Sequence, residues 1–107
     1  MERRRVVITG LGAVTPLGLT AADTWQAVRE GRCGIGPITQ FDPADQKVKL
    51  AAEVKGFVPE NYLPKPEAKR MGRFTQFAVV AAKEAMADAA FTLAEDEEDR
   101  CGVIRCV

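Results

Sequence analysis

The sequence predicts an α/β fold in which two buried strands are joined through a helical crossover. Three segments carry this prediction: a β-branched apolar run at residues 5–10, an alanine-rich stretch without Gly or Pro at residues 73–90, and a second short apolar run at residues 100–104. A strand, a helical crossover and a strand imply a right-handed, parallel pairing of the first and last elements. We therefore expect an open parallel sheet covered by helices.

The first segment is apolar without alternation. Such a run is typical of a strand that is buried on both faces, as in a parallel sheet. A helix is predicted to begin after Thr20, whose hydroxyl can accept a backbone hydrogen bond, with Asp23 completing a capping-box pattern. Gly31 supplies the left-handed residue that ends this helix. The chain therefore opens as strand, turn and helix.

The middle of the chain is interrupted by glycines and prolines. Residues 31–45 indicate a folded loop anchored by a few apolar side chains, and residues 49–54 predict an extended segment. Pro59, Pro64 and Pro66 exclude a long helix before Glu67. Only short elements are expected here.

The stretch at residues 73–90 gives the clearest helix of the chain. Its apolar residues recur at helical spacing, and small alanine side chains indicate close packing on several sides. The predicted core stripe comprises Phe74, Phe77, Ala78, Ala81 and Ala85. The acidic run at residues 95–99 is interpreted as a solvated loop.

Composition excludes several classes of function. Fifteen Lys and Arg balance fifteen Asp and Glu, so the net charge is zero and no global field favours nucleic acid or an anionic membrane. The chain contains no histidine, which excludes Ser-His-Asp and Cys-His nucleophile systems and HExxH zinc sites. The longest wholly apolar run beyond the first strand, residues 77–82, is far too short to cross a bilayer.

Cysteine usage favours a reducing, cytoplasmic setting. Cys33, Cys101 and Cys106 are an odd number without the density of a disulfide scaffold. The basic and apolar N-terminus resembles a secretory signal, but Thr9 and Gly10 dilute its apolar stretch. We interpret the thiols of Cys33 and Cys101 as structural.

The glycine motifs do not complete a cofactor site. Gly10 and Gly12 follow a strand as in a dinucleotide-binding turn, but Thr15 stands in place of the third glycine and Pro16 lies where a helix should run. Pro37 likewise replaces the lysine that a phosphate-binding loop requires. No cofactor and no metal are predicted.

One local basic cluster stands out, formed by Lys65, Lys69, Arg70 and Arg73. A solvated entrance to the long helix explains it without any function. The functional alternative is a docking surface for an acidic macromolecule, because several cations around one turn can receive carboxylates or a phosphate.

Four signatures follow one another along the chain. They are Val-Val-Ile-Thr-Gly-Leu-Gly-Ala-Val-Thr-Pro-Leu-Gly at 6–18, Trp25 with Gly-Arg-Cys-Gly-Ile at 31–35, Phe41-Asp42, and Arg-Met-Gly-Arg-Phe-Thr-Gln-Phe-Ala at 70–78 with Ala-Ala-Lys-Glu-Ala at 81–85. Together they resemble the β-ketoacyl-acyl carrier protein synthases, and are most similar to the type II, long-chain condensing enzymes of bacterial fatty-acid synthesis. The resemblance extends over residues 3–104.

The resemblance implies a thiolase-like αβα layered fold, of which residues 1–107 would form the N-terminal part of the first domain. It implies a homodimeric parent enzyme that elongates acyl-ACP with malonyl-ACP by decarboxylative Claisen condensation. The family's catalytic cysteine and two histidines belong to motifs that this chain does not contain, so no catalytic residue is assigned and the fragment alone is predicted to be inactive. The alternative is a non-catalytic carrier-protein-binding or dimerisation module.

The resemblance also assigns the docking residues. Lys65, Lys69 and Arg70 match positions at which type II synthases present basic residues to the acidic helix of acyl carrier protein. Two features depart from the family pattern. Gly72 replaces a common Asp, and Arg105, Cys106 and Val107 stand where a glycine-rich loop is expected.

Overall fold

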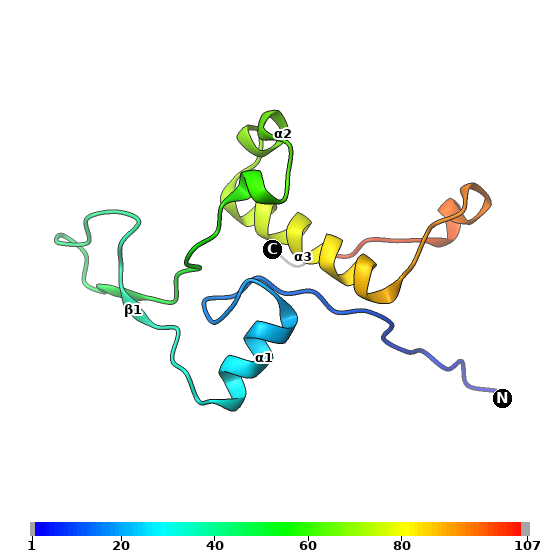
Figure 1. The fold of residues 1–107 in the computed structure, drawn as a ribbon, viewed down its shortest axis with the longest axis horizontal. Helices are drawn as coiled ribbons and strands as arrows, with labels where there is room; N and C mark the ends of the chain where they lie inside the picture. Colours follow the sequence, from blue (N-terminus) through cyan, green and yellow to red (C-terminus); the bar gives the residue numbers. More distant parts are fainter. Residues whose placement is uncertain (1, 106–107) are drawn as a thin grey trace.

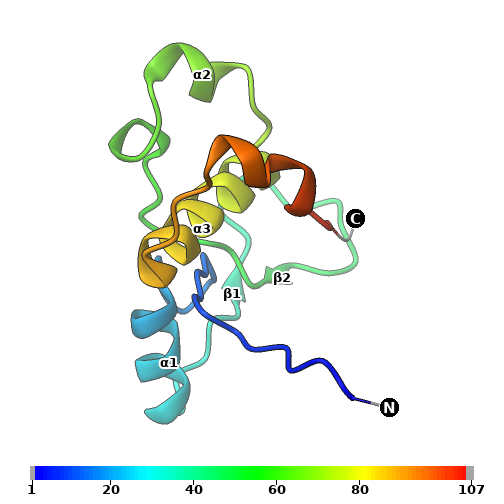
Figure 2. The ribbon, with the colours of Figure 1, turned by 90° about the vertical axis from the view of Figure 1, so that its right-hand side faces the viewer.

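A computed structural model describes residues 2–105 of the chain. A long helix, α3, lies at the centre, α2 lies at its N-terminal end, and the N-terminal segment passes between α3 and α1 (Figures 1 and 2). The elements in chain order are α1 (Ala21–Arg29), β1 (Gly36–Pro37), β2 (Leu50–Ala51), the 3₁₀ helix η1 (Pro59–Asn61), α2 (Lys65–Lys69), α3 (Arg73–Ala89) and the 3₁₀ helix η2 (Glu95–Arg100).

Helix α1 begins and ends where the sequence predicts. The Asp23 N–H donates to Thr20 Oγ1 at 3.0 Å, and Thr20 itself has extended backbone angles, as an N-cap residue should. Gly31 adopts a φ of 71°, in the left-handed region that stops a helix. Local capping chemistry therefore defines this element.

The middle of the chain forms one small antiparallel sheet. Gly36 of β1 is opposite Ala51 of β2, and Pro37 is opposite Leu50. The extended segment predicted at residues 49–54 is thus confirmed over two residues. The expectation that the prolines allow only short helices beyond it is also confirmed, since η1 has three residues and α2 has five.

The two predicted parallel strands are wrong for this structure. Neither residues 5–10 nor residues 100–104 form a strand, and η2 covers the whole acidic run at residues 95–99, for which the sequence predicts a loop. Val6 is 92% exposed and Ile104 is 97% exposed. A strand requires a neighbouring strand for its backbone hydrogen bonds, and among residues 2–105 neither segment has one.

Helix α3 is confirmed to within one residue of its predicted end, and Ala90 follows it with a left-handed φ of 50°. The predicted stripe is only partly correct, because Phe74 is 66% exposed whereas Val80, outside the stripe, is buried. One face of α3, carrying Arg73, Gln76, Phe77 and Lys83, contacts residues 54–68. A second face, carrying Ala81, Glu84, Ala85 and Asp88, contacts residues 10–13.

The described chain is more open than a typical domain of its size. Its radius of gyration is 17.4 Å, whereas about 13 Å is expected for a compact domain of about 100 residues. The hydrophobic core of residues 2–105 comprises Ala27, Phe57, Leu63, Ala68 and Val80. Within this range no helix is both long and apolar enough to cross a membrane.

Candidate functional site

The three predicted docking residues lie together on and directly after α2. Lys65 and Lys69 are the first and last residues of this helix, and Arg70 caps its C-terminus. All three side chains are exposed, and within residues 2–105 none of them makes an ion pair or a side-chain hydrogen bond. We call Lys65, Lys69 and Arg70 the basic ledge. Its charges are available to a partner.

The segment that carries the basic ledge is anchored on α3. Leu63 and Ala68 are buried, with 3% and 4% of their surface exposed. The Gln76 side-chain amide donates to the Ala68 carbonyl at 3.0 Å, and Lys83 Nζ donates to the Tyr62 carbonyl at 3.4 Å. Helix α2 is therefore held at a defined place above the start of α3 (Figure 1).

Arg73, the fourth cation of the sequence cluster, has a different role. Its Nη2 donates to the Val54 carbonyl at 2.9 Å. Its guanidinium carbon lies 5.0 Å from the Phe77 ring centroid and 5.9 Å from that of Phe57, within the range of cation–π attraction. Arg73 thus stabilises the junction between the chain after β2 and α3. The charge pattern of the sequence does not separate Arg73 from the other three cations.

The glycine motif of the N-terminal segment allows close packing against α3. A Cβ atom added to Gly10 would overlap the Ala85 carbonyl oxygen, and one added to Gly12 would overlap that of Ala81. Only residues without a side chain fit at these two positions. The interpretation of this motif as structural, rather than as a nucleotide site, agrees with these contacts.

Two carboxylates of α3 hold the same segment, and the sequence did not reveal them. Glu84 accepts from the backbone N–H groups of Ala13 at 3.0 Å and Ala21 at 2.8 Å. Asp88 accepts from the N–H of Leu11 at 3.0 Å. Both side chains support the fold, and nothing in their spacing along α3 distinguishes them from solvated charges.

A third carboxylate organises the loop before β2. Glu53 accepts from the N–H of Thr39 at 2.9 Å and from that of Gln40 at 3.1 Å. The hydrogen bond from the Thr39 backbone is the main reason that the pKa of Glu53 lies below its usual range. This carboxylate is an acceptor for its own chain and not a candidate acid catalyst.

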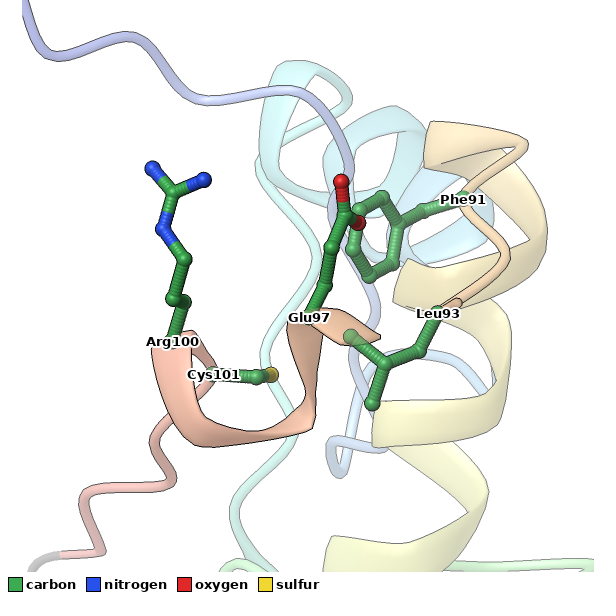
Figure 3. Close-up of a pocket in the computed structure, with 5 residues that line it drawn as sticks. All are labelled: Phe91, Leu93, Glu97, Arg100 and Cys101. Carbon is green, nitrogen blue, oxygen red and sulfur yellow. The ribbon is translucent and has the colours of Figure 1, made fainter. Parts of the chain in front are cut away.

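Two thiols, those of Cys33 and Cys101, lie among residues 2–105, and both are free. Cys101 is exposed beside an open cavity of about 280 Å³ that is lined by Phe91, Leu93, Glu97, Arg100 and Cys101. Figure 3 shows the Arg100 side chain extending away from the Cys101 sulfur. Cys33 is exposed as well, and Cys106 lies outside the described residues. Between residues 2 and 105 no group of three or more side chains could hold a metal ion.

Comparison with known proteins identifies the class. Residues 3–107 match the sequence profile described as "Beta-ketoacyl synthase, N-terminal domain", and the chain therefore belongs to the β-ketoacyl synthase family. Among its relatives, the 3-oxoacyl-[acyl-carrier-protein] synthase 2 of Synechocystis sp. is 50% identical over 97% of this chain and 25% of its own length. The enzyme of the same name from Staphylococcus aureus is 46% identical over 95% of this chain and 25% of its own length.

Solved structures give the same family. The ishigamide ketosynthase/chain length factor superposes with a TM-score of 0.73 at 38% identity, over 92% of this chain and 23% of that one. A β-ketoacyl synthase from Burkholderia phymatum has a TM-score of 0.68 at 34% identity, over 91% of this chain and 24% of that one. The structural neighbours are thus ketosynthases. This chain spans about a quarter of the length of the curated relatives it matches.

Proposed function

We propose that this chain is the N-terminal part of a 3-oxoacyl-[acyl-carrier-protein] synthase of type 2. Residues 1–107 would begin the first thiolase-like domain of a cytoplasmic, homodimeric enzyme with αβα layers. That enzyme lengthens an acyl chain by decarboxylative Claisen condensation between acyl-ACP and malonyl-ACP. The identities of 46% and 50% to synthases of this name support the proposal.

In this proposal the chain contributes partner recognition and not chemistry. It has no histidine, and among the described residues its cysteines have no activating base. The family's catalytic cysteine and histidines would come from segments beyond those seen here. The part of the function that these residues can carry is docking of the carrier protein.

The observation that carries the docking proposal is the exposure of three cations on and directly after one short helix, α2. Lys65, Lys69 and Arg70 are exposed and lack intramolecular ion pairs within residues 2–105. Exposed charge pairs contribute about 0 to 1 kcal/mol each, so their joint effect is steering and orientation of an acidic partner. Association through such pairs weakens as salt is added.

The test reverses two of these charges in the full-length synthase that contains this segment. We expect Lys69→Glu together with Arg70→Glu to lower kcat/KM for carrier-protein substrates about tenfold at low salt, since up to four unfavourable pair energies of this size are introduced or lost. Acyl transfer from a small thioester should be unchanged, because the reacting atoms lie elsewhere.

The matched control reverses Lys47 and Lys49, two exposed cations in the loop before β2. This variant has the same change in net charge and should behave as the wild-type enzyme with both substrates. Equal losses with carrier-bound and small thioesters in the Lys69 and Arg70 variant would show that the basic ledge supports the fold, and the docking assignment would be dropped.

A further inference from the structure

We infer that Gln76 is a positioning residue for the basic ledge: its side-chain amide fixes the C-terminal turn of α2 and so sets the direction in which Lys69 and Arg70 point. The inference rests on the docking function proposed above. Gln76 carries no charge and belongs to α3 rather than α2, so the pattern of charges in the sequence does not identify it.

Helix α2 cannot hold its own shape. It has five residues, and its N-terminus at Pro64 has no side-chain cap. Helices far longer than this are marginal in water unless tertiary contacts support them. The position of the ledge therefore depends on what α2 contacts.

The contact between Gln76 and Ala68 lies directly beside the two cations. Ala68 is the buried residue of α2, and it immediately precedes Lys69 and Arg70 in the chain. The Gln76 Nε2 group donates to the Ala68 carbonyl at 3.0 Å in a partly buried setting. Carbonyls in the last turn of a helix have no regular intrahelical partner. The Ala68 carbonyl accepts from the Met71 N–H at 3.2 Å and from the Gln76 amide, and the second of these donors ties the last turn of α2 to α3.

Other contacts keep the segment attached when this donor is lost. Leu63 stays buried, Lys83 reaches the Tyr62 carbonyl, and the Met71 N–H still donates to the Ala68 carbonyl at 3.2 Å. We therefore expect Gln76→Ala to leave the protein folded while α2 loses its fixed orientation. Ledge charges that point in varied directions meet the acidic surface of the carrier protein less often in the productive geometry.

The first experiment measures steady-state kinetics of the full-length synthase with Gln76→Ala. Loss of one hydrogen bond of ordinary strength corresponds to about a threefold to tenfold change, and we expect the KM for carrier-protein substrates to rise by this amount. The KM and kcat for a small thioester should stay at the wild-type values. Gln76→Glu should raise the KM for carrier-protein substrates at least as much, because a carboxylate oxygen repels the Ala68 carbonyl.

The control is Gln26→Ala, which removes an amide that donates to Glu30 at 2.9 Å on the exposed face of α1. It deletes the same side chain and a similar hydrogen bond away from the ledge. It should change neither KM.

A second experiment repeats Gln76→Ala in an enzyme whose Lys65, Lys69 and Arg70 are all alanine. If Gln76 acts through the ledge, the substitution has no further effect on KM in this background, because coupled residues give non-additive effects. If the triple-alanine enzyme uses carrier-protein substrates as well as the wild type does, the docking proposal is overturned, and this inference with it. If the triple-alanine enzyme is impaired, three results would overturn the positioning role alone. These are no effect of Gln76→Ala in the wild-type background, an additive effect in the triple-alanine background, or an equal effect with small thioesters.

Discussion

Glu84 Oε1 accepts the backbone N–H of Ala21 at 2.8 Å, across a separation of 63 residues. Ala21 is the first residue of α1, so the carboxylate satisfies one of the N–H groups that a helix leaves free at its start. The negative charge also lies at the positive end of the helix dipole. With its second oxygen on the Ala13 N–H, Glu84 joins α3 both to α1 and to the N-terminal segment.

Replacing Glu84 by alanine should therefore loosen both attachments. Two backbone donors lose their acceptor, at a cost of about 1 to 3 kcal/mol. We expect amide hydrogen exchange at Ala13 and Ala21 to accelerate, and Glu84→Gln to show a smaller effect because an amide oxygen remains. Glu98→Ala, on exposed η2, is the control. Unchanged exchange at both amides in Glu84→Ala would contradict the assignment.

Gly12 should tolerate no side chain. A Cβ atom there would overlap the backbone of α3 at Ala81, which cannot move aside as a flexible side chain can. We expect Gly12→Ala to destabilise the protein by about 1 to 3 kcal/mol, as overpacking does in a well-packed core. Gly36→Ala is a matched control, because a Cβ at Gly36 meets no atom within 4 Å. Thermal unfolding compares the melting temperatures of Gly12→Ala and Gly36→Ala. Equal values would contradict the close approach of Gly12 to the backbone of α3.

The Glu53 carboxylate should make stability depend on pH. Its pKa is lower in the folded chain than in the unfolded chain, chiefly through the Thr39 N–H. The stabilisation is thus complete above the unfolded pKa and is lost as the pH falls through the folded one. We expect Glu53→Gln to be less stable than the wild type at pH 7, with a difference that shrinks below about pH 4. Urea unfolding at both pH values tests this, with Glu60→Gln as a control. A stability difference between wild type and Glu53→Gln that grows on acidification would contradict this prediction.

The isolated chain of 107 residues should be inactive and only marginally folded. Its described core has five side chains, while Val6, Ile8, Val103 and Ile104 are each more than 80% exposed. Apolar segments of this kind invite aggregation. We expect no condensation product from acyl-ACP and malonyl-ACP and a broad thermal transition. A sharp cooperative transition in a monodisperse monomer, or product above the no-enzyme background, would contradict this expectation.

Local chemistry made part of the fold predictable. The N-cap at Thr20, the left-handed Gly31 and the absence of Gly and Pro in α3 fixed the two main helices closely. Strand formation was not predictable in the same way, since apolar composition at residues 5–10 indicates a strand but only a neighbouring strand can complete its hydrogen bonds.

The candidate site shows the same limit. The sequence shows the cluster of four cations, but it does not show that the role of Arg73 differs from that of the other three. Arg73 is held by Phe57, Phe77 and the Val54 carbonyl, and two of these three partners lie 16 and 19 residues before it. Gln76 was missed because a neutral amide gives no signal in charge patterning. Such roles depend on which chain segment lies opposite a helix face.

The two contact faces of α3 also imply an order of folding. Gln76 and Lys83 reach partners 8 and 21 residues away, whereas Glu84 and Asp88 reach partners 63 to 77 residues away. Closing a longer loop costs more entropy, and contacts that are distant in sequence form later. We therefore expect residues 57–90 to assemble first. Residues 10–13 leave the ribosome before α3 does, but they can attach only after α3 has been synthesised.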